Sequence, residues 1–311
     1  MFKHLLVPLD GSPSAECALP AAAQIAARNG AAISLLHVLE RDAPAEVHGV
    51  RHLRTADEAK AYLGAVAQRL AAQGVTADVH VHAVAVEDVA RGIADHLLEL
   101  NQDTVVMSTH GGGLRTRLFG SMAQQAVALG RMPVLLVRPG AEGAGAPPAM
   151  TRVLLPHDGV PEHEPALPAG IEFARLLGAA LHLVLVVPTR GTLSGSQRLS
   201  GHALPRAAAA MLELATEEAE AHLRRHVEQL RGEGLEVTAQ VRRGDPAEAI
   251  ALAAAVFCAD VIVLGTHGKA GTRAFWSVST AARVAARSDA SLLFVPVGEA
   301  RHHAETMPVN P

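Results

Sequence analysis

The chain has few cysteines and no long apolar segment. Its two cysteines, Cys17 and Cys258, lie in alanine-rich helical stretches and fit free thiols better than a disulfide framework. We expect them to be buried free thiols in a reducing compartment. No apolar run approaches the roughly 18 residues of a membrane span, and Met1 leads into a strand-like segment rather than a signal peptide. These absences predict a cytoplasmic protein without a membrane anchor.

Aromatic residues and net charge are also scarce. The formal net charge is −4 with both signs mixed, which provides neither the basic surface that nucleic acids need nor a strongly acidic one. Aromatic residues make up 3% and apolar residues 49% of the chain, so the core must be built from Ala, Val and Leu, as in helix-covered parallel sheets. His80 and His82 lie two apart on a predicted strand with no third ligand at metal-site spacing, so no metal site is predicted.

One structural unit occurs twice. Pro8 and Pro156 are 148 residues apart, and so are Asp10 and Asp158. In each unit, short apolar runs alternate with stretches of helical spacing, which predicts an α/β fold of parallel strands joined by helical crossovers. The expected strands are 2–10, 31–39, 75–84, 103–107 and 133–137, then 152–159, 181–187, 235–241, 259–264 and 291–295. The expected helices include 14–29, 55–73, 87–100, 120–130, 204–231 and 245–258.

A Gly/Pro-rich segment separates the two units. Residues 141–151 are too rich in glycine and proline for a core element and are expected to form a linker. The predicted domains are therefore 1–140 and 152–298. Residues 299–311 are expected to form a flexible tail.

Each unit has a glycine loop after its fourth predicted strand. In the first unit the loop runs Ser108-Thr109-His110-Gly111-Gly112-Gly113, and in the second it runs from Gly265 to Gly271. Such a loop before a helix exposes backbone N–H groups in one concavity, which suits a phosphate or another anion. The alternative is a tight strand-to-helix turn without a ligand. Asp10 and Asp158 at the ends of the first strands could equally form Asx turns or helix caps.

These motifs resemble the universal stress protein family, as a tandem of two domains. The resemblance rests on Leu-Val-Pro-Leu-Asp-Gly-Ser at 6–12, Ser-Thr-His-Gly at 108–111, Leu-Phe-Gly-Ser at 118–121, Pro-Val-Leu-Leu-Val at 133–137, Leu-Leu-Pro-His-Asp-Gly at 154–159 and Gly-Thr-His-Gly-Lys-Ala-Gly at 265–271. It implies two open parallel five-stranded sheets of strand order 3-2-1-4-5, flanked by helices and similar to adenine-nucleotide alpha-hydrolases. That order brings the loops after strands one and four together at the switch point, where such sheets bind ligands.

The resemblance also implies which residues would bind a nucleotide. ATP-binding family members have Gly, two residues, Gly, nine residues, Gly, then Ser or Thr. The first unit has Ser108 at the first glycine and only eight residues before Gly120, and the second has Val278 at the third glycine. Asp10 would hold the nucleoside and the backbone near Val38 would face the base. The implied set is Pro8, Asp10, Val38, Met107, Ser108, His110, Gly111, Gly113, Gly120, Ser121 and Met122 in the first unit, and Asp158, Gly265, Gly268 and Ser279 in the second.

Three functions remain open at this point. The first is a non-enzymatic stress-response or regulatory protein that binds ATP, with magnesium, or another adenine nucleotide in its first domain. The second is a scaffold that binds no nucleotide and acts through protein partners. The third is a slow ATP hydrolase, although the sequence contains neither a Walker loop nor a Gly-x-Ser-x-Gly elbow. No catalytic residue is predicted.

The fifth strand of each unit would be an uncovered sheet edge. Both are apolar, at Val134–Val137 and Leu292–Val295, so something must cover them. We expect the two to pair across a pseudo-two-fold axis, as fifth strands do when family members dimerise. Further association into a homodimer and an unidentified regulatory protein partner stay open, whereas nucleic acid and membrane are not expected as partners.

Overall fold

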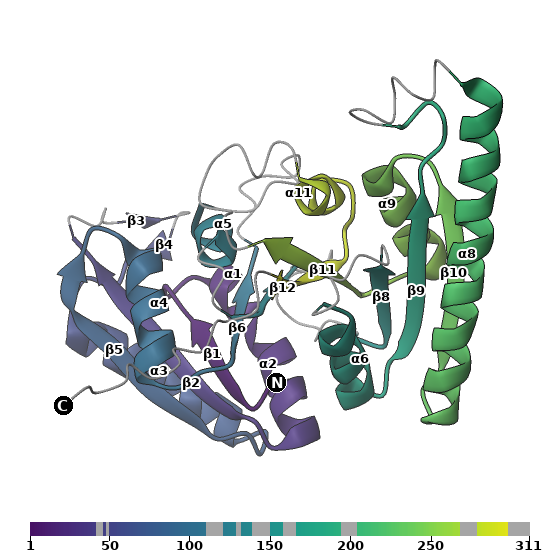
Figure 1. Cartoon of the computed structure of the whole chain (residues 1–311). Coiled ribbons are helices and arrows are strands. Elements are labelled where there is room, and N and C mark those ends of the chain that lie inside the picture. Colours follow the sequence, from purple (N-terminus) through teal and green to yellow (C-terminus); the bar gives the residue numbers. More distant parts are fainter. Residues whose placement is uncertain are drawn as a thin grey trace, which may run out of the picture.

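A computed structural model of the chain describes residues 1–41, 46–47, 50–109, 121–128, 132–138, 150–157, 166–193, 204–267 and 279–297. The first half (Figure 1) contains β1 His4–Pro8, α1 Pro13–Glu16, α2 Leu19–Asn29, β2 Ala32–Glu40, β3 Glu46–Val47, β4 Val50–Arg51, α3 Ala56–Ala71, β5 Ala77–Val86, α4 Val89–Glu99, β6 Thr104–Ser108, α5 Ser121–Ala128 and β7 Val134–Val137. The second contains β8 Arg152–His157, α6 Ala166–Leu177, β9 Ala180–Val187, α8 Pro205–Gly232, β10 Val237–Arg243, α9 Pro246–Phe257, β11 Val261–His267, α11 Thr280–Ala285 and β12 Ser291–Val297.

The strands form one continuous sheet of ten. Its order is β10-β9-β8-β11-β12-β7-β6-β1-β2-β5, so each half has the predicted order 3-2-1-4-5. Pairing within each half is parallel. The halves meet where β12 and β7 pair antiparallel, with Leu293 opposite Leu135. The predicted pairing of the two fifth strands is therefore confirmed within the chain.

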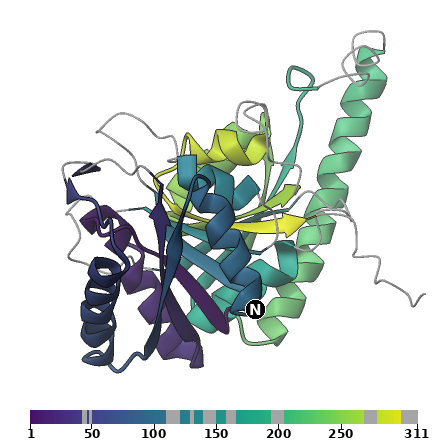
Figure 2. The ribbon, with the colours of Figure 1, turned by 90° about the vertical axis from the view of Figure 1, so that its left-hand side faces the viewer.

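Helices cover both faces of the sheet. One core layer includes side chains from α2, α3, α6 and α8, and the other includes side chains from α4, α5, α9 and α11. The long helix α8 runs along the outer side of the second half in both ribbon views (Figures 1 and 2). The buried aliphatic residues of the strands alternate between the two layers, as the pleat of a sheet requires.

Several helices begin directly after a polar N-cap residue. Thr55, Asp88, Asp245 and Ser279 are N-cap residues whose side chains each accept a hydrogen bond from a backbone N–H three residues later. The expected helix over 14–29 is divided into α1 and α2, with proline in the first turn of each. The segment expected to be irregular between Arg41 and Arg54 contains the short antiparallel pair β3 and β4.

The cysteines differ from the expectation. Cys17 is half-buried and Cys258 is exposed. Cys258 lies at the C-cap of α9 with a φ of 53°, outside the packed face of that helix. The prediction that both thiols are buried was therefore wrong, because an alanine-rich helix can end on a residue that faces solvent.

Candidate functional site

The second domain has a cleft at the carboxyl ends of β8 and β11. Its volume is about 310 Å³. These two strands lie side by side at the switch point of the second half, where open α/β sheets bind their ligands. Apolar side chains form most of the wall, and the lining residues are Pro156, His157, Ala166, Leu167, Val184, Val186, Pro246, Ile250, Val263, Leu264, Gly265, Ser279, Thr280 and Ala281.

The lining of this cleft repeats the site implied in the first unit. The register of the two units makes Pro156 the counterpart of Pro8 and Val186 the counterpart of Val38, both 148 residues apart. By the same comparison, the counterparts of Met107, Ser108 and Ser121 are Leu264, Gly265 and Ser279, respectively. All five counterparts line the cleft. The structure thus brings together, in the second domain, residues equivalent to a set that was implied for the first.

Gly265 and Ser279 both have structural roles at the cleft. A Cβ atom on Gly265 would lie 3.2 Å from Cγ1 of Val297 and 3.5 Å from Cβ of Ala166, so this glycine allows β11 to pack closely against β12 and α6. The Ser279 hydroxyl oxygen accepts a 3.1 Å hydrogen bond from the Ala282 amide and caps α11. Close packing and capping account for both residue types without a ligand.

An ion pair joins two helices beside the cleft. Oδ1 of Asp245, the N-cap of α9, accepts hydrogen bonds from the Glu248 amide at 3.1 Å and from Nη2 of Arg283 on α11 at 2.8 Å. Burial alone would raise the pKa of the Asp245 carboxyl, but these two donors outweigh it and hold the pKa below its usual value. The pair fixes α9 relative to α11, whose residues form one wall of the cleft.

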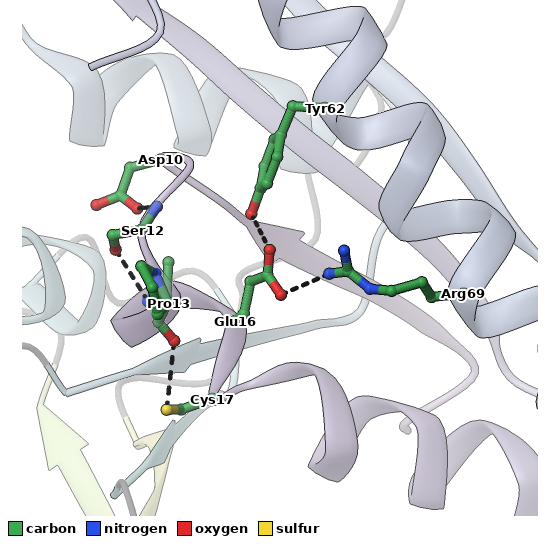
Figure 3. A network of polar contacts seen from close by, with 8 residues as sticks. Asp10, Ser12, Pro13, Glu16, Cys17, Tyr62 and Arg69 are labelled. Carbon is green, nitrogen blue, oxygen red and sulfur yellow. Dashed lines mark hydrogen bonds and ion pairs between the residues drawn. The ribbon is translucent and has the colours of Figure 1, made fainter. Parts of the chain in front are cut away.

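In the first domain, Asp10 shapes the turn after β1. Its Oδ1 accepts a 2.8 Å hydrogen bond from the Ser12 amide, and Ser12 in turn caps α1 (Figure 3). Gly11 has a φ of 90°, and the Leu53 side chain lies 3.1 Å from the position of its missing Cβ. The Asx turn that was the alternative for Asp10 is therefore present.

A second polar network lies close to this turn. Oε1 of Glu16 accepts a 2.9 Å hydrogen bond from the Tyr62 hydroxyl, and its other oxygen pairs with Arg69 at 2.5 Å (Figure 3). Burial, followed by the negative charge of Glu16, raises the pKa of Tyr62 far above its usual value. The network ties α1 to α3 next to the carboxyl end of β1.

The other predicted residues of the first domain that can be described are mostly buried. Met107 and Val38 lie in one core layer, and Val38 packs against Gly92 of α4. Met122 is half-buried on α5. Pro8 is half-buried at the end of β1. Ser108 is buried at the end of β6, and its hydroxyl oxygen has no hydrogen-bond partner among the described residues.

Several predicted residues lie outside the described part of the chain. These are His110, Gly111, Gly113, Gly120, Asp158 and Gly268, and for Ser121 only the backbone position at the start of α5 is described. Their proposed contacts with a nucleotide remain predictions from the resemblance.

Comparison with known proteins settles the family. The model of the universal stress protein family matches residues 1–138 and 150–296. The chain belongs to the universal stress protein family. No curated protein gives a match.

Two solved structures resemble this universal stress protein over nearly its whole length. A universal stress protein from Archaeoglobus fulgidus DSM 4304 is 19% identical, with a TM-score of 0.68 and coverage of 96% of this chain and 98% of that one. A functionally unknown protein from Pseudomonas aeruginosa PAO1 is 17% identical, with a TM-score of 0.65 and coverage of 94% and 92%. At these identities the likeness shows the fold alone. In the described part of this universal stress protein, no helix is long and apolar enough to cross a membrane.

Reasoning from the sequence missed part of this universal stress protein's site. Leu167 and Ile250 line the cleft, and Asp245 and Arg283 brace it, but none of the four was named as a site residue. In the sequence, Asp245 was identified only as the first residue of the helix predicted over 245–258. The sequence repeat could have shown part of the site. If the nucleotide-binding residues implied for the first unit are transferred to the second unit, Pro156, Val186 and Leu264 are identified.

Proposed function

We propose that this universal stress protein is a non-enzymatic regulatory protein that binds an adenine nucleotide in the cleft of its second domain. The observation that supports the proposal is the lining: five cleft residues are the counterparts of five residues that the family resemblance implies for nucleotide binding. A volume of about 310 Å³ is within the range of small-ligand pockets, roughly 300–1,000 Å³.

The wall suits the two ends of a nucleotide. Val184, Val186 and Ile250 give an apolar surface for a purine ring. The backbone of Gly265 lies at the beginning of the loop that suits a phosphate, and the hydroxyl of Ser279 lies after that loop, at the N-terminus of α11. Regulation would then require that the nucleotide binds two states of the protein with different affinities.

The first domain remains a second candidate site. The buried Ser108 hydroxyl at the carboxyl end of β6, next to the predicted glycine loop, finds no hydrogen-bond partner in the part of the chain that the structure describes. A buried hydroxyl that lacks a partner costs free energy, and a ligand that bonds to it would recover that cost. The experiment must therefore distinguish the two domains.

The test is to denature freshly purified protein, identify any released nucleotide by chromatography, and titrate the emptied protein with ATP and magnesium by calorimetry. We expect about one nucleotide per chain. Leu167→Trp, which fills the second cleft, should abolish binding, whereas Gly120→Val in the first loop and Leu98→Trp on the exposed face of α4 should leave it intact.

The other outcomes separate the alternatives. Loss of binding in Gly120→Val alone would move the site to the first domain. No released nucleotide and no heat at millimolar ATP would overturn nucleotide binding and favour a scaffold that acts through protein partners. Steady phosphate release that Leu167→Trp abolishes would show a slow ATP hydrolase instead of a non-enzymatic protein.

A further inference from the structure

The face of α9 that points away from the core is apolar. The exposed residues of this helix are Glu248, Leu252, Ala255 and Val256, whose spacing places them in one line along the helix, called here the outer stripe. The side chains of Leu252 and Val256 are 54% and 66% exposed. Because the opposite face of α9 is packed in the core, the helix is apolar on both sides, which is typical of a helix that is covered on both sides.

The equivalent helix of the first domain carries charges at these positions. The N-cap residues of α4 and α9 are aspartates that lie 157 positions apart, so the two helices can be aligned from their first turns. At this offset Asp95 is the counterpart of Leu252, and Glu99 is the counterpart of Val256. All four residues are exposed. The fold therefore accepts a charged side chain at both positions, but the second domain has a large aliphatic side chain at each.

The outer stripe has opposite charges at its two ends. Glu248 lies in the first turn of α9 and is the only charged residue of that helix. At the other end, Nη1 of Arg152 donates a 3.1 Å hydrogen bond to the carbonyl oxygen of Phe257, and the guanidinium lies 5.9 Å from the centre of the Phe257 ring. These contacts hold an exposed cation beside the C-terminus of α9. The stripe is therefore negative at its beginning and positive at its end.

A second copy of the outer stripe, placed antiparallel, matches this pattern. With a two-fold axis at Leu252, this residue meets its own copy, and Val256 of one chain lies opposite Glu248 of the other. Helix side chains lean toward the N-terminus of their own helix, so Glu248 of one chain leans toward Arg152 of the other. Antiparallel helix dipoles add to this attraction. A parallel arrangement would bring like charges together.

We propose that the chain forms a homodimer in which the outer stripes of two copies of α9 pack antiparallel. The charge complementarity of the stripe with its own copy identifies the occupant of this surface as a second copy of the chain. One stripe per chain buries a small area, and interfaces below about 1,200 Å² are typical of weak association, so we expect a dimer that dissociates at micromolar concentrations. Dimerisation through the outer stripe does not require a bound nucleotide.

Sedimentation velocity of the full-length protein tests the proposal. The buffer contains a reducing agent, because Cys258 is exposed and could otherwise link two chains. We expect the sedimentation coefficient to rise from that of a monomer to that of a dimer between about 1 and 200 µM. Leu252→Asp and Val256→Glu install the residue types of the first domain, and each should weaken the dimer at least about tenfold, because it removes two buried aliphatic side chains from the interface.

The matched control is Leu98→Asp on α4. Leu98 is 56% exposed and occupies the position of Ala255 in the first domain, so this change should leave the dimer intact. Circular dichroism confirms that each variant is folded. A chain that stays monomeric at about 200 µM, or a dimer that survives both Leu252→Asp and Val256→Glu, would overturn the proposal.

Charge reversal tests the antiparallel arrangement. Glu248→Arg should weaken the dimer, because it places two cations together at each end of the paired stripes, and the further change Arg152→Glu should restore it. If the double variant is not folded, the salt dependence replaces it: added salt should weaken the wild-type dimer and strengthen that of Glu248→Arg. No effect of Glu248→Arg, or neither rescue nor this opposite response to salt, would overturn the antiparallel pairing.

Discussion

The ring of Phe2 lies against the ring of Phe173, with centroids 5.1 Å apart and planes inclined by 53°. Phe2 precedes β1 in the first domain, Phe173 belongs to α6 in the second, and both side chains are fully buried. Next to them, the N-terminal amine pairs with Glu172 at 2.7 Å. The two domains thus share one core layer as well as one sheet.

Phe173→Ala should destabilise the whole chain. Removing a buried aromatic ring costs about 3–5 kcal/mol, and here the ring packs against the other domain. Denaturant unfolding followed by circular dichroism measures the change. Leu98→Ala on the exposed side of α4 is the control and should cost less than about 0.5 kcal/mol. If Phe173→Ala lowers the free energy of unfolding no more than Leu98→Ala does, packing in the shared core layer does not stabilise the protein.

Arg138→Ala should weaken the junction of the two domains. Nε and Nη2 of Arg138 donate to the carbonyl oxygens of Ala290 and Ala285 in the second domain. Hydrogen bonds from charged donors contribute about 1.5–3 kcal/mol each, so the loss of both should cost at least about 3 kcal/mol. Arg138→Lys should recover only part of it, because lysine lacks the fork that reaches two acceptors.

A surface ion pair is the comparison for Arg138. Arg175 pairs with Glu233 at 2.6 Å, but both side chains are largely exposed. Arg175→Ala should therefore change the free energy of unfolding by no more than about 1 kcal/mol. Equal losses at Arg138 and Arg175, measured by urea denaturation, would argue against a special role of Arg138 at the junction.

Asp245→Asn should reduce stability at neutral pH and not at acid pH. Asparagine keeps the helix cap but loses the charge that pairs with Arg283, which is worth about 0.5–1 kcal/mol at this partly exposed site. Because the pKa of Asp245 is lower in the folded than in the unfolded protein, its stabilisation exists at neutral pH and is lost as the pH falls through the folded-state pKa. Thermal unfolding of the wild type and of Asp245→Asn from neutral to acid pH measures the difference in their stability. A difference that does not change with pH would contradict a stabilising role of the Asp245 charge.

Tyr62 should resist ionisation in the folded protein. It is the only tyrosine, so the phenolate absorbance of the chain reports this residue alone. Burial and Glu16 raise its pKa, so the absorbance should not appear near pH 10, where the denatured protein should titrate. The stabilisation is complete below about pH 10 and is lost as the pH rises further. Glu16→Gln should lower the pKa, and a native titration near pH 10 would show that Tyr62 is solvated.

Much of the fold could be predicted because it is encoded locally and then repeated. Apolar runs such as Val105–Met107 and Leu292–Val295 are strands in the structure, and the two copies confirm each other. The pairing of β7 with β12 also followed from the sequence, because an apolar edge strand needs a partner.

The candidate site was less predictable. The glycine pattern directed attention to the first domain, and the cleft described here is in the second. Gly265 illustrates the reason: a glycine required by close packing against Val297 has the same sequence signature as a glycine required by a phosphate.

By itself the sequence determined the elements, their order and the duplication, because strand and helix periodicity and turn residues act between neighbours in the chain. Only the tertiary structure decided which distant side chains meet. His157 and His222 are 65 residues apart, and their contact depends on how α8 packs across the end of β8. The same holds for Asp245 and Arg283, since the angle and depth of helix packing on a sheet arise from the whole core and not from any one segment.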